Sequence, residues 1–213
     1  MGRETRAMQD DDGFNPAVLW LLDGESLWKA NCAACHPIEK MKGVAARYPA
    51  LHRKRLINLE QRINLCRTEQ QKAPAFAYES RELLSLTAHV GRQSRGHPIS
   101  VEISDRNRSF FEAGKALFHR RQGQLNLACV QCHDERWGKS LAGTTIPQAH
   151  PTGYPLYRLE WQGVGSLQRR LRNCMIGVRA EPYAYGSDEF VELELYLMWR
   201  ARGMKLETPA VRP

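Results

Sequence analysis

Apolar residues recur at helical spacing in two pairs of segments along this chain. One pair begins at Ser80 and Ser187, where a serine stands before acidic residues and an apolar face, the usual start of a helix. Gly91 and Gly203 are expected to stop these two helices. Their buried faces are predicted to contain Leu83, Leu84, Thr87 and Val90 in the first and Val191, Leu195 and Met198 in the second.

The other pair of segments lies earlier in each half. Gly24–Trp28 and Gly114–Phe118 share a glycine followed at three and four places by a large apolar and an aromatic residue. Such a glycine lets a helix cross closely over another helix. Strand signals are nearly absent, so the rest of each half is predicted to be short helices and loops. His97–Ser100, short and containing proline, is predicted to link the halves.

Both pairs belong to an internal repeat of the whole chain. Leu59–Cys66 matches Leu167–Cys174, with an arginine four residues before each cysteine and a proline eight residues after it. The second copy carries about seven extra residues, Arg120 to Asn126, before its next motif. The repeat predicts a mainly α-helical protein with two tandem domains, residues 14–98 and 104–213.

Each half also contains one C-x-x-C-H sequence. The two copies are Cys32-Ala-Ala-Cys35-His36 and Cys129-Val-Gln-Cys132-His133. This spacing attaches c-type haem, because the two thiols add to the haem vinyl groups and the histidine binds the iron from one side. A zinc half-site also uses C-x-x-C, but zinc does not explain a histidine directly after the second cysteine in both copies. We therefore predict two cytochrome c-like domains with two covalently attached haem c groups.

Composition narrows the classes of function. Apolar residues make up 42% and charged residues 25%, as in ordinary soluble proteins, and no apolar run is long enough to cross a membrane. The net charge is +8, and four haem propionates would reduce it to about +4, which suits an anionic small substrate or an acidic protein partner. No nucleic-acid-binding motif accompanies this charge, so neither nucleic acid nor membrane insertion is expected.

Localisation is inferred from the haem chemistry. Residues Met1 to Asp12 are charged and lack the apolar core of a secretory signal. Haem of this type is attached outside the cytoplasm in bacteria. The chain is therefore interpreted as a mature periplasmic protein from which a signal peptide has been removed.

The two cysteines outside the haem motifs occupy equivalent places in the repeat. Cys66 and Cys174 are predicted to bind the two irons opposite His36 and His133, which lowers the reduction potential relative to methionine ligation. Met175 is a rival in the second half, but the first copy has no methionine at that place. A disulfide between the two cysteines is the other alternative, although cysteines of tandem domains would each face their own haem.

Three further residues are predicted to be structural and not iron ligands. His52 lies among lysines and arginines and is interpreted as a solvated surface residue. His89 lies in an apolar helix and is interpreted as a packed histidine, and Met198 as a core residue.

Arg170 lies one helical turn before Cys174 and on the same face. It is predicted to hold an anion beside that cysteine and to favour the thiolate, with haem-propionate pairing as the alternative. The same segment holds three more arginines, Arg169, Arg172 and Arg179. The first copy has only Arg62 and Arg67, so Cys174 is predicted to act on an anionic substrate and Cys66 to be a plain ligand.

The segment Arg169-Arg-Leu-Arg-Asn-Cys174-Met-Ile-Gly-Val-Arg179-Ala-Glu-Pro182, followed by Met198-Trp-Arg-Ala-Arg-Gly203, resembles the SoxA family of cytochromes. The resemblance covers both haem domains. It implies a periplasmic complex with a SoxX-like cytochrome that oxidatively couples thiosulfate to a cysteine of a SoxYZ-like carrier protein. It also implies that Cys174 is the active-site cysteine, carried as a persulfide on the haem iron, and that Arg170 and an arginine near Arg200 belong to the thiosulfate site.

On this resemblance the chain is expected to be an L-cysteine S-thiosulfotransferase subunit of the dihaem type, because Cys32, Cys35, His36 and Cys66 are all retained. Arg202 and Arg179 are alternatives to Arg200 in the substrate site. Two other functions stay open. They are a dihaem cytochrome that only transfers electrons and a thiosulfate dehydrogenase that needs no carrier.

Overall fold

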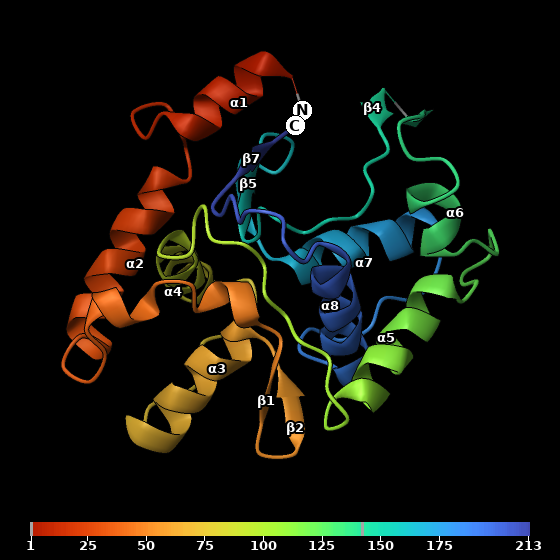
Figure 1. Cartoon of the computed structure of the whole chain (residues 1–213). Coiled ribbons are helices and arrows are strands. Elements are labelled where there is room, and N and C mark those ends of the chain that lie inside the picture. Colours follow the sequence, from red (N-terminus) through yellow and green to blue (C-terminus); the bar gives the residue numbers. More distant parts are fainter. Residues whose placement is uncertain (1, 142) are drawn as a thin grey trace.

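The computed structural model describes residues 2–141 and 143–213, and helices dominate both halves (Figure 1). The first half contains α1 (Arg3–Asp10), α2 (Val18–Asn31), α3 (Leu59–Leu65) and α4 (Arg81–Arg92), with the 3₁₀ turns η1 (Ile38–Met41) and η2 (Ala45–Arg47) and the π-helical turn η3 (Cys66–Gln70). The second half contains α5 (Arg108–His119), α6 (Cys129–His133), α7 (Leu167–Gly177) and α8 (Asp188–Arg200). Among the described residues, no helix is both long and apolar enough to cross a membrane.

Helices α4 and α8 begin as the sequence predicts. The side chains of Ser80 and Ser187 each accept a hydrogen bond from the backbone N–H three residues on, which caps the helix. All residues of the two predicted apolar faces are buried. Gly203 lies just beyond α8 with a φ of +82°. The stop predicted at Gly91 is wrong, because this residue lies inside α4, where it packs against Thr208.

The predicted crossing glycines lie where helices meet. A Cβ atom on Gly24 of α2 would overlap the backbone carbonyl of Ser85 in α4. A Cβ atom on Gly114 of α5 would overlap the carbonyl of Glu192 in α8 in the same way. Only glycine permits backbones to approach this closely. Ser85 and Glu192 both lie five residues after the capping serine of their helix, so the two halves use one helix pair twice.

The chain contains more strand than its sequence pattern predicts. The strands are β1 (Ala50–His52), β2 (Arg55–Ile57), β3 (Ser140–Leu141), β4 (Thr144–Thr145), β5 (Leu156–Arg158), β6 (Gly163–Gly165) and β7 (Val211–Arg212). Antiparallel hairpins β1–β2 and β5–β6 stand at equivalent places before α3 and α7, and β7 pairs in parallel with β5. Strands of two or three residues are too short for an alternating pattern to be recognised.

The segment predicted as a linker is packed against the second half. Ile99 is buried, and its backbone N–H and carbonyl bond to Met204 and Gly203 beyond α8. The C-terminal strand returns to α1, where the backbone N–H of Val211 donates to the side chain of Gln9 at 3.3 Å. Contacts thus cross between the halves at several points, and the domain limits 14–98 and 104–213 stay a prediction.

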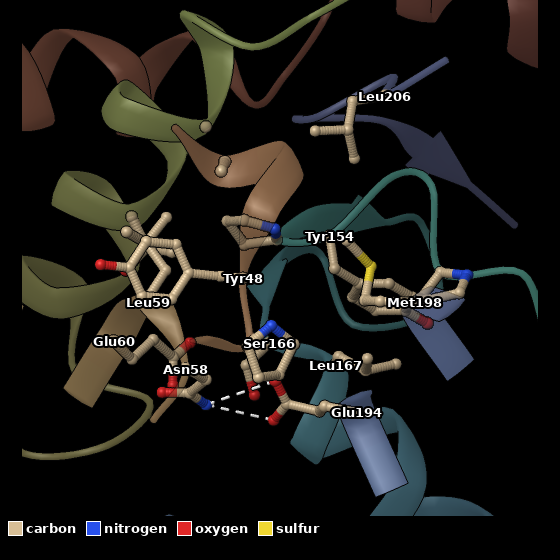
Figure 2. Close-up of a pocket in the computed structure, with 16 residues that line it drawn as sticks. Tyr48, Asn58, Leu59, Glu60, Tyr154, Ser166, Leu167, Glu194, Met198 and Leu206 are labelled. Carbon is tan, nitrogen blue, oxygen red and sulfur yellow. Dashed lines mark hydrogen bonds between the residues drawn. The ribbon is translucent and has the colours of Figure 1, made fainter. Parts of the chain in front are cut away.

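A small cavity of about 80 Å³ lies where the halves meet (Figure 2). Its lining residues come in pairs that match in the repeat, namely Tyr48 and Tyr154, Pro49 and Pro155, Asn58 and Ser166, Leu59 and Leu167, and Thr87 and Glu194. Equivalent residues meeting across one contact are the mark of a two-fold arrangement. The buried Asn58 donates to the Glu194 carboxylate at 3.1 Å, and Gln168 donates to the same carboxylate at 2.6 Å.

Candidate haem sites and active site

The second half encloses a cavity of about 430 Å³ between α5, α6, α7 and the β3–β4 hairpin. Cys129, Cys132 and His133 of α6 line it together with Cys174 of α7, as the repeat predicts. The other walls are mainly apolar and include Leu117, Phe118, Leu125, Leu127, Ile146, Leu171, Leu193 and Leu197. A largely apolar cavity with two thiols, one histidine and a facing thiol fits haem c.

His133 is oriented as a metal-binding histidine should be. Its Nδ1 atom donates a hydrogen bond to the carbonyl oxygen of Pro147 at 2.7 Å. This bond fixes the ring and leaves Nε2 available for a metal. Burial lowers the pKa of His133, which favours the neutral ring that coordinates metals.

The cysteines of this cavity are held away from water. Burial raises the pKa of Cys129 to about 11. Burial also raises the pKa of Cys174, while the positive charges of Arg170 and Arg158 act in the opposite direction. A thiol ligand must lose its proton, so a nearby cation or a metal ion is what such a buried cysteine requires.

The segment around Cys174 contains four arginines, and among the described residues that line the cavity Arg170 is the one that comes from this set. In the described part of the chain its guanidinium donates no hydrogen bond to the protein. Arg169 and Arg172 instead stack on aromatic rings at 4.5 and 4.7 Å. Arg179 and Arg202 are exposed. The structure therefore places Arg170 and Cys174 at the same cavity, whereas the neighbouring arginines stack on aromatic rings or are exposed.

Arg200 lies near His133, behind the haem-attachment helix. Its Nη1 and Nη2 atoms donate to the carboxylate of Asp134 at 3.1 and 2.5 Å, and Nη2 also donates to the carbonyl of Gln148. Asp134 directly follows His133 in the chain. Arg200 is not among the described residues that line the cavity, so the structure does not bring it to Cys174. Its contact with a substrate stays a prediction.

The first-half site is more open. Cys35 is exposed, and Cys32 and Cys66 are half-buried. Burial raises the pKa of Cys32, and the charge of Cys66 acts in the same direction. The ring of His36 lies 6.3 Å from that of Trp28, centroid to centroid. The surrounding apolar cluster fits one face of a haem and includes Trp28, Leu86, Val90, Ile38, Met41, Leu59, Ile63 and Phe76.

The structure also decides three secondary expectations. His52 is not a solvated surface residue, because it is half-buried and its Nδ1 atom lies 3.2 Å from Nη1 of Arg62. His89 is confirmed as a packed histidine with its ring 5.9 Å from Trp28. Met198 is confirmed as a core residue. All six cysteines are free, so the alternative disulfide is not formed.

Two residues near Cys174 were not predicted from the sequence. Burial raises the pKa of Tyr154 to about 12, and the charges of Arg170, Cys174 and Arg158 all act on its hydroxyl. Arg158 belongs to β5, and Tyr154 stands two residues before that strand, in a hairpin that the sequence pattern did not predict. The repeat itself was the available signal, because Tyr154 matches Tyr48 once the two hairpins are superposed.

Comparison with known proteins decides the family. The SoxA/TsdA cytochrome c domain family matches residues 23–99 and 113–206, one span in each half. The chain is 37% identical to the L-cysteine S-thiosulfotransferase subunit SoxA of Pseudaminobacter salicylatoxidans, over 98% of this chain and 77% of that protein. The chain belongs to the SoxA family.

Other SoxA proteins extend this result. The L-cysteine S-thiosulfotransferase subunit SoxA of Rhodovulum sulfidophilum is 33% identical over 98% of this chain and 77% of its own length. The crystal structure of SoxXA from P. pantotrophus matches with a TM-score of 0.96 and 32% identity, over 100% of this chain and 84% of that chain. The predictions of a mainly α-helical fold, two cytochrome c domains and two covalently attached haem c groups are confirmed.

Proposed function

We propose that this SoxA chain is the dihaem subunit of an L-cysteine S-thiosulfotransferase, which oxidatively joins thiosulfate to a cysteine of a SoxYZ-like carrier protein. The observation that carries the proposal is the meeting of Cys174 and Arg170 at the wall of the second cavity, facing Cys129, Cys132 and His133. The relatives that match nearly the whole chain bear the name of this activity.

The reaction balances as an oxidation by two electrons. One thiosulfate dianion and one carrier thiol give a carrier cysteine S-thiosulfonate, one proton and two electrons. Haem c, which Cys129, Cys132, His133 and Cys174 would hold, would supply one-electron acceptance, and the partner cytochrome would be the oxidant that takes up both electrons. Disulfide-type exchange favours an attacking sulfur whose pKa is near the ambient pH, and a persulfide on Cys174 is a weaker base than a thiol.

The chain's own residues position the substrate. Cys174, loaded as a persulfide, forms a sulfur–sulfur bond with the outer sulfur of thiosulfate as the two electrons leave. The carrier thiolate then attacks that same outer sulfur, and the Cys174 persulfide is the leaving group. Arg170 holds the sulfonate oxygens through charge-assisted hydrogen bonds. The mainly apolar walls around Cys174 limit the access of water, which would otherwise compete for the sulfur.

The partner is proposed to be a SoxX-like cytochrome that covers the mouth of the second cavity. Two large apolar side chains that line the cavity, Leu125 and Leu141, are also exposed at the surface. Trp137 and Ile176 are further exposed apolar side chains of the second half. Exposed apolar side chains beside a cavity are typical of a site of association. The complex is proposed to act in the periplasm, where haem c proteins of bacteria mature.

The first test is peptide mass spectrometry across Cys174, prepared without reductant and without oxygen. We expect this peptide to be heavier by one sulfur atom, whereas the peptide containing Cys66, an internal control in the same sample, carries none. A plain thiol on Cys174 in freshly isolated active protein would contradict the persulfide.

Product analysis then separates the functions. The haem-loaded protein with its SoxX-like partner, thiosulfate and the carrier should give a carrier cysteine enlarged by a thiosulfonate group. Tetrathionate as the sole product, formed without the carrier, would instead indicate a thiosulfate dehydrogenase. Indifference to thiosulfate in every combination would indicate a cytochrome that only transfers electrons.

A further inference from the structure

The hydrogen bond between His133 and Pro147 is part of a larger network. Nδ1 of the His133 ring donates to the carbonyl oxygen of Pro147 at 2.7 Å. The residue that follows each of these two, Asp134 in one case and Gln148 in the other, is bonded to Arg200. One guanidinium group therefore joins the two segments that the histidine bond connects.

The contacts of Arg200 hold both segments in a defined geometry. Its Nη1 and Nη2 atoms donate to the two carboxylate oxygens of Asp134 at 3.1 and 2.5 Å, and Nη2 also donates to the backbone carbonyl of Gln148 at 3.3 Å. Two parallel bonds between a guanidinium and a carboxylate fix the orientation of both groups. The side chain of Arg200 is only 16% exposed, so water screens this pair less than a surface ion pair.

Arg200 itself rests on the helical core of the second half. It is the last residue of α8, and the carbon atom of its guanidinium lies 4.6 Å from the centre of the Phe118 ring and 5.8 Å from that of Tyr196. Phe118 belongs to α5, is buried and lines the cavity that contains His133. Arg200 thus connects the haem-attachment segment and the facing loop to two packed helices, which is the rigid support that an oriented ligand requires.

The first half has the matching arginine but lacks the network. Arg92 and Arg200 each stand 26 residues after the distal cysteine of their half. Arg92 donates instead to the carboxylate of Asp12, near the N-terminus, at 2.7 Å. Within the described residues the ring of His36 forms no hydrogen bond with the protein, and the residue after it is a proline, which offers no carboxylate. The network is therefore a feature of the second haem site.

We propose that Arg200 is a positioning residue, which fixes the orientation of the His133 ring at the second haem. It does so by holding Asp134 and Gln148, so that the carbonyl of Pro147 stays aimed at Nδ1 of the ring. An imidazole whose second nitrogen donates to a carbonyl is a more basic metal ligand. This inference depends on haem attachment alone and not on the proposed thiosulfate chemistry.

The test uses the haem-loaded protein in complex with its SoxX-like partner. Electron paramagnetic resonance of the oxidised complex records the ferric low-spin haems, and the signal that Cys174→Ala alters is assigned to the second haem. In Arg200→Gln and in Asp134→Asn the g values of this haem should shift, because the histidine ring is no longer held in one orientation. The signals of the other haems should not change.

The reduction potential separates positioning from charge. Arg200→Gln removes a positive charge and Asp134→Asn removes a negative one, so a pure charge effect has opposite signs in the two variants. The double variant keeps the net charge. Its second haem should have a higher reduction potential than the wild type, because a weaker bond to Pro147 makes His133 a less basic ligand and disfavours the ferric state. A potential equal to that of the wild type would overturn the proposal.

Three variants control for other effects. Gln148→Ala keeps the backbone carbonyl that Arg200 contacts, and Arg92→Gln breaks the matching pair in the first half. Both should leave the g values and the potential of the second haem unchanged. Arg200→Lys keeps the charge but loses the planar fork, so its g values should lie between those of the wild type and Arg200→Gln. A shift in Arg92→Gln as large as that in Arg200→Gln would contradict the inference, because general loosening would then explain both.

A final measurement distinguishes this role from contact with the substrate, which the resemblance to the SoxA family implies for an arginine near Arg200. Thiosulfate binding to the oxidised complex is followed by titration calorimetry. Shifted g values with an unchanged Kd in Arg200→Gln would support the positioning role. A raised Kd with g values and potential like those of the wild type would show that Arg200 contacts thiosulfate, and the inference would be wrong. No change in any of the three quantities would also overturn it.

Discussion

The two halves share one framework but differ around the distal cysteine. In the first half Arg62 contacts His52, and Cys66 begins a π-helical turn. In the second half Arg170 has no protein acceptor among the described residues, and Cys174 lies inside a continuous α-helix. The two matching arginines therefore differ. The guanidinium of Arg62 contacts a protein side chain, whereas that of Arg170 has its hydrogen-bond donors available.

The second half also has walls that the first half lacks. Residues Arg120–Asn126 fold against the end of α7, where Gln124 and Leu125 donate backbone hydrogen bonds to the carbonyls of Arg179 and Val178. The β3–β4 hairpin closes another side of the cavity. Substrate chemistry requires a site that excludes water, whereas electron transfer tolerates an exposed haem edge. Insertions into a duplicated framework thus give the second half an enclosed cavity, as the proposed substrate chemistry requires.

The largest effect is expected from replacing the distal cysteines one at a time. Cys174→Ala should lower thiosulfate-dependent turnover by at least about a thousandfold, because it removes the sulfur that forms the bond. Cys66→Ala should change turnover by less than about tenfold. Haem attachment, read from the pyridine haemochrome, should be intact in both. Equal losses in the two variants would show that the halves do not have separate roles.

A second prediction concerns the junction between the halves, where Thr87 on one side faces Glu194 on the other. Burial raises the pKa of Glu194 to about 7, above its usual value of 4.5. Between about pH 4.5 and 7 the folded protein retains a proton that the unfolded chain has released, so the free energy of unfolding falls as pH rises through this range. Above about pH 7 the curve should flatten.

The variant Glu194→Gln should reduce this fall, by on the order of 3 kcal/mol across the range. Burial also raises the pKa of Glu60 in the same junction, so some pH dependence of the same sign should persist. Denaturant unfolding of the haem-loaded protein between pH 4.5 and 8 measures the effect. Thr87→Val serves as the control, since it should shift stability equally at every pH. An unchanged slope in Glu194→Gln would contradict the assignment.

The crossing glycines should respond alike in both halves. Gly24→Ala and Gly114→Ala would each push a methyl group into a backbone carbonyl, and each should lower the free energy of unfolding by about 1–3 kcal/mol. Gly177→Ala is the matched control, because a Cβ atom there meets nothing within 4 Å. It should be neutral or stabilise slightly. Unequal losses for the two crossing glycines would show that the halves are not packed alike.

The smallest expected effect comes from the matched arginines. Arg170→Leu should raise the KM for thiosulfate by about tenfold, because it removes a charge-assisted contact with the anion. Arg62→Leu should leave KM unchanged, because its guanidinium faces His52 and not the substrate. Steady-state kinetics of the complex provide the measurement. An equal rise in both variants would place thiosulfate at the first haem as well.

Much of the site could be predicted from local sequence. The C-x-x-C-H motifs predicted the attachment cysteines and their histidines, and the match between Cys66 and Cys174 predicted the distal residues; Cys129, Cys132, His133 and Cys174 indeed line one cavity. The β5 hairpin escaped prediction because its strands have three residues each, which leaves no alternation to detect. His52 was misread for the same reason, since its basic neighbours suggested a solvated residue and its position in β1 was not visible.

The sequence alone therefore determined the duplicated framework and the two haem-attachment motifs, because each depends on residues close together in the chain, and it predicted Cys174 as the cysteine that acts. Only the tertiary structure decided which arginines meet Cys174. Arg170 lines the cavity with Cys174, Arg200 is held by Asp134, and Arg169 and Arg172 stack on aromatic rings. A side chain's partners depend on contacts between segments distant in sequence, and a local pattern carries no record of those contacts.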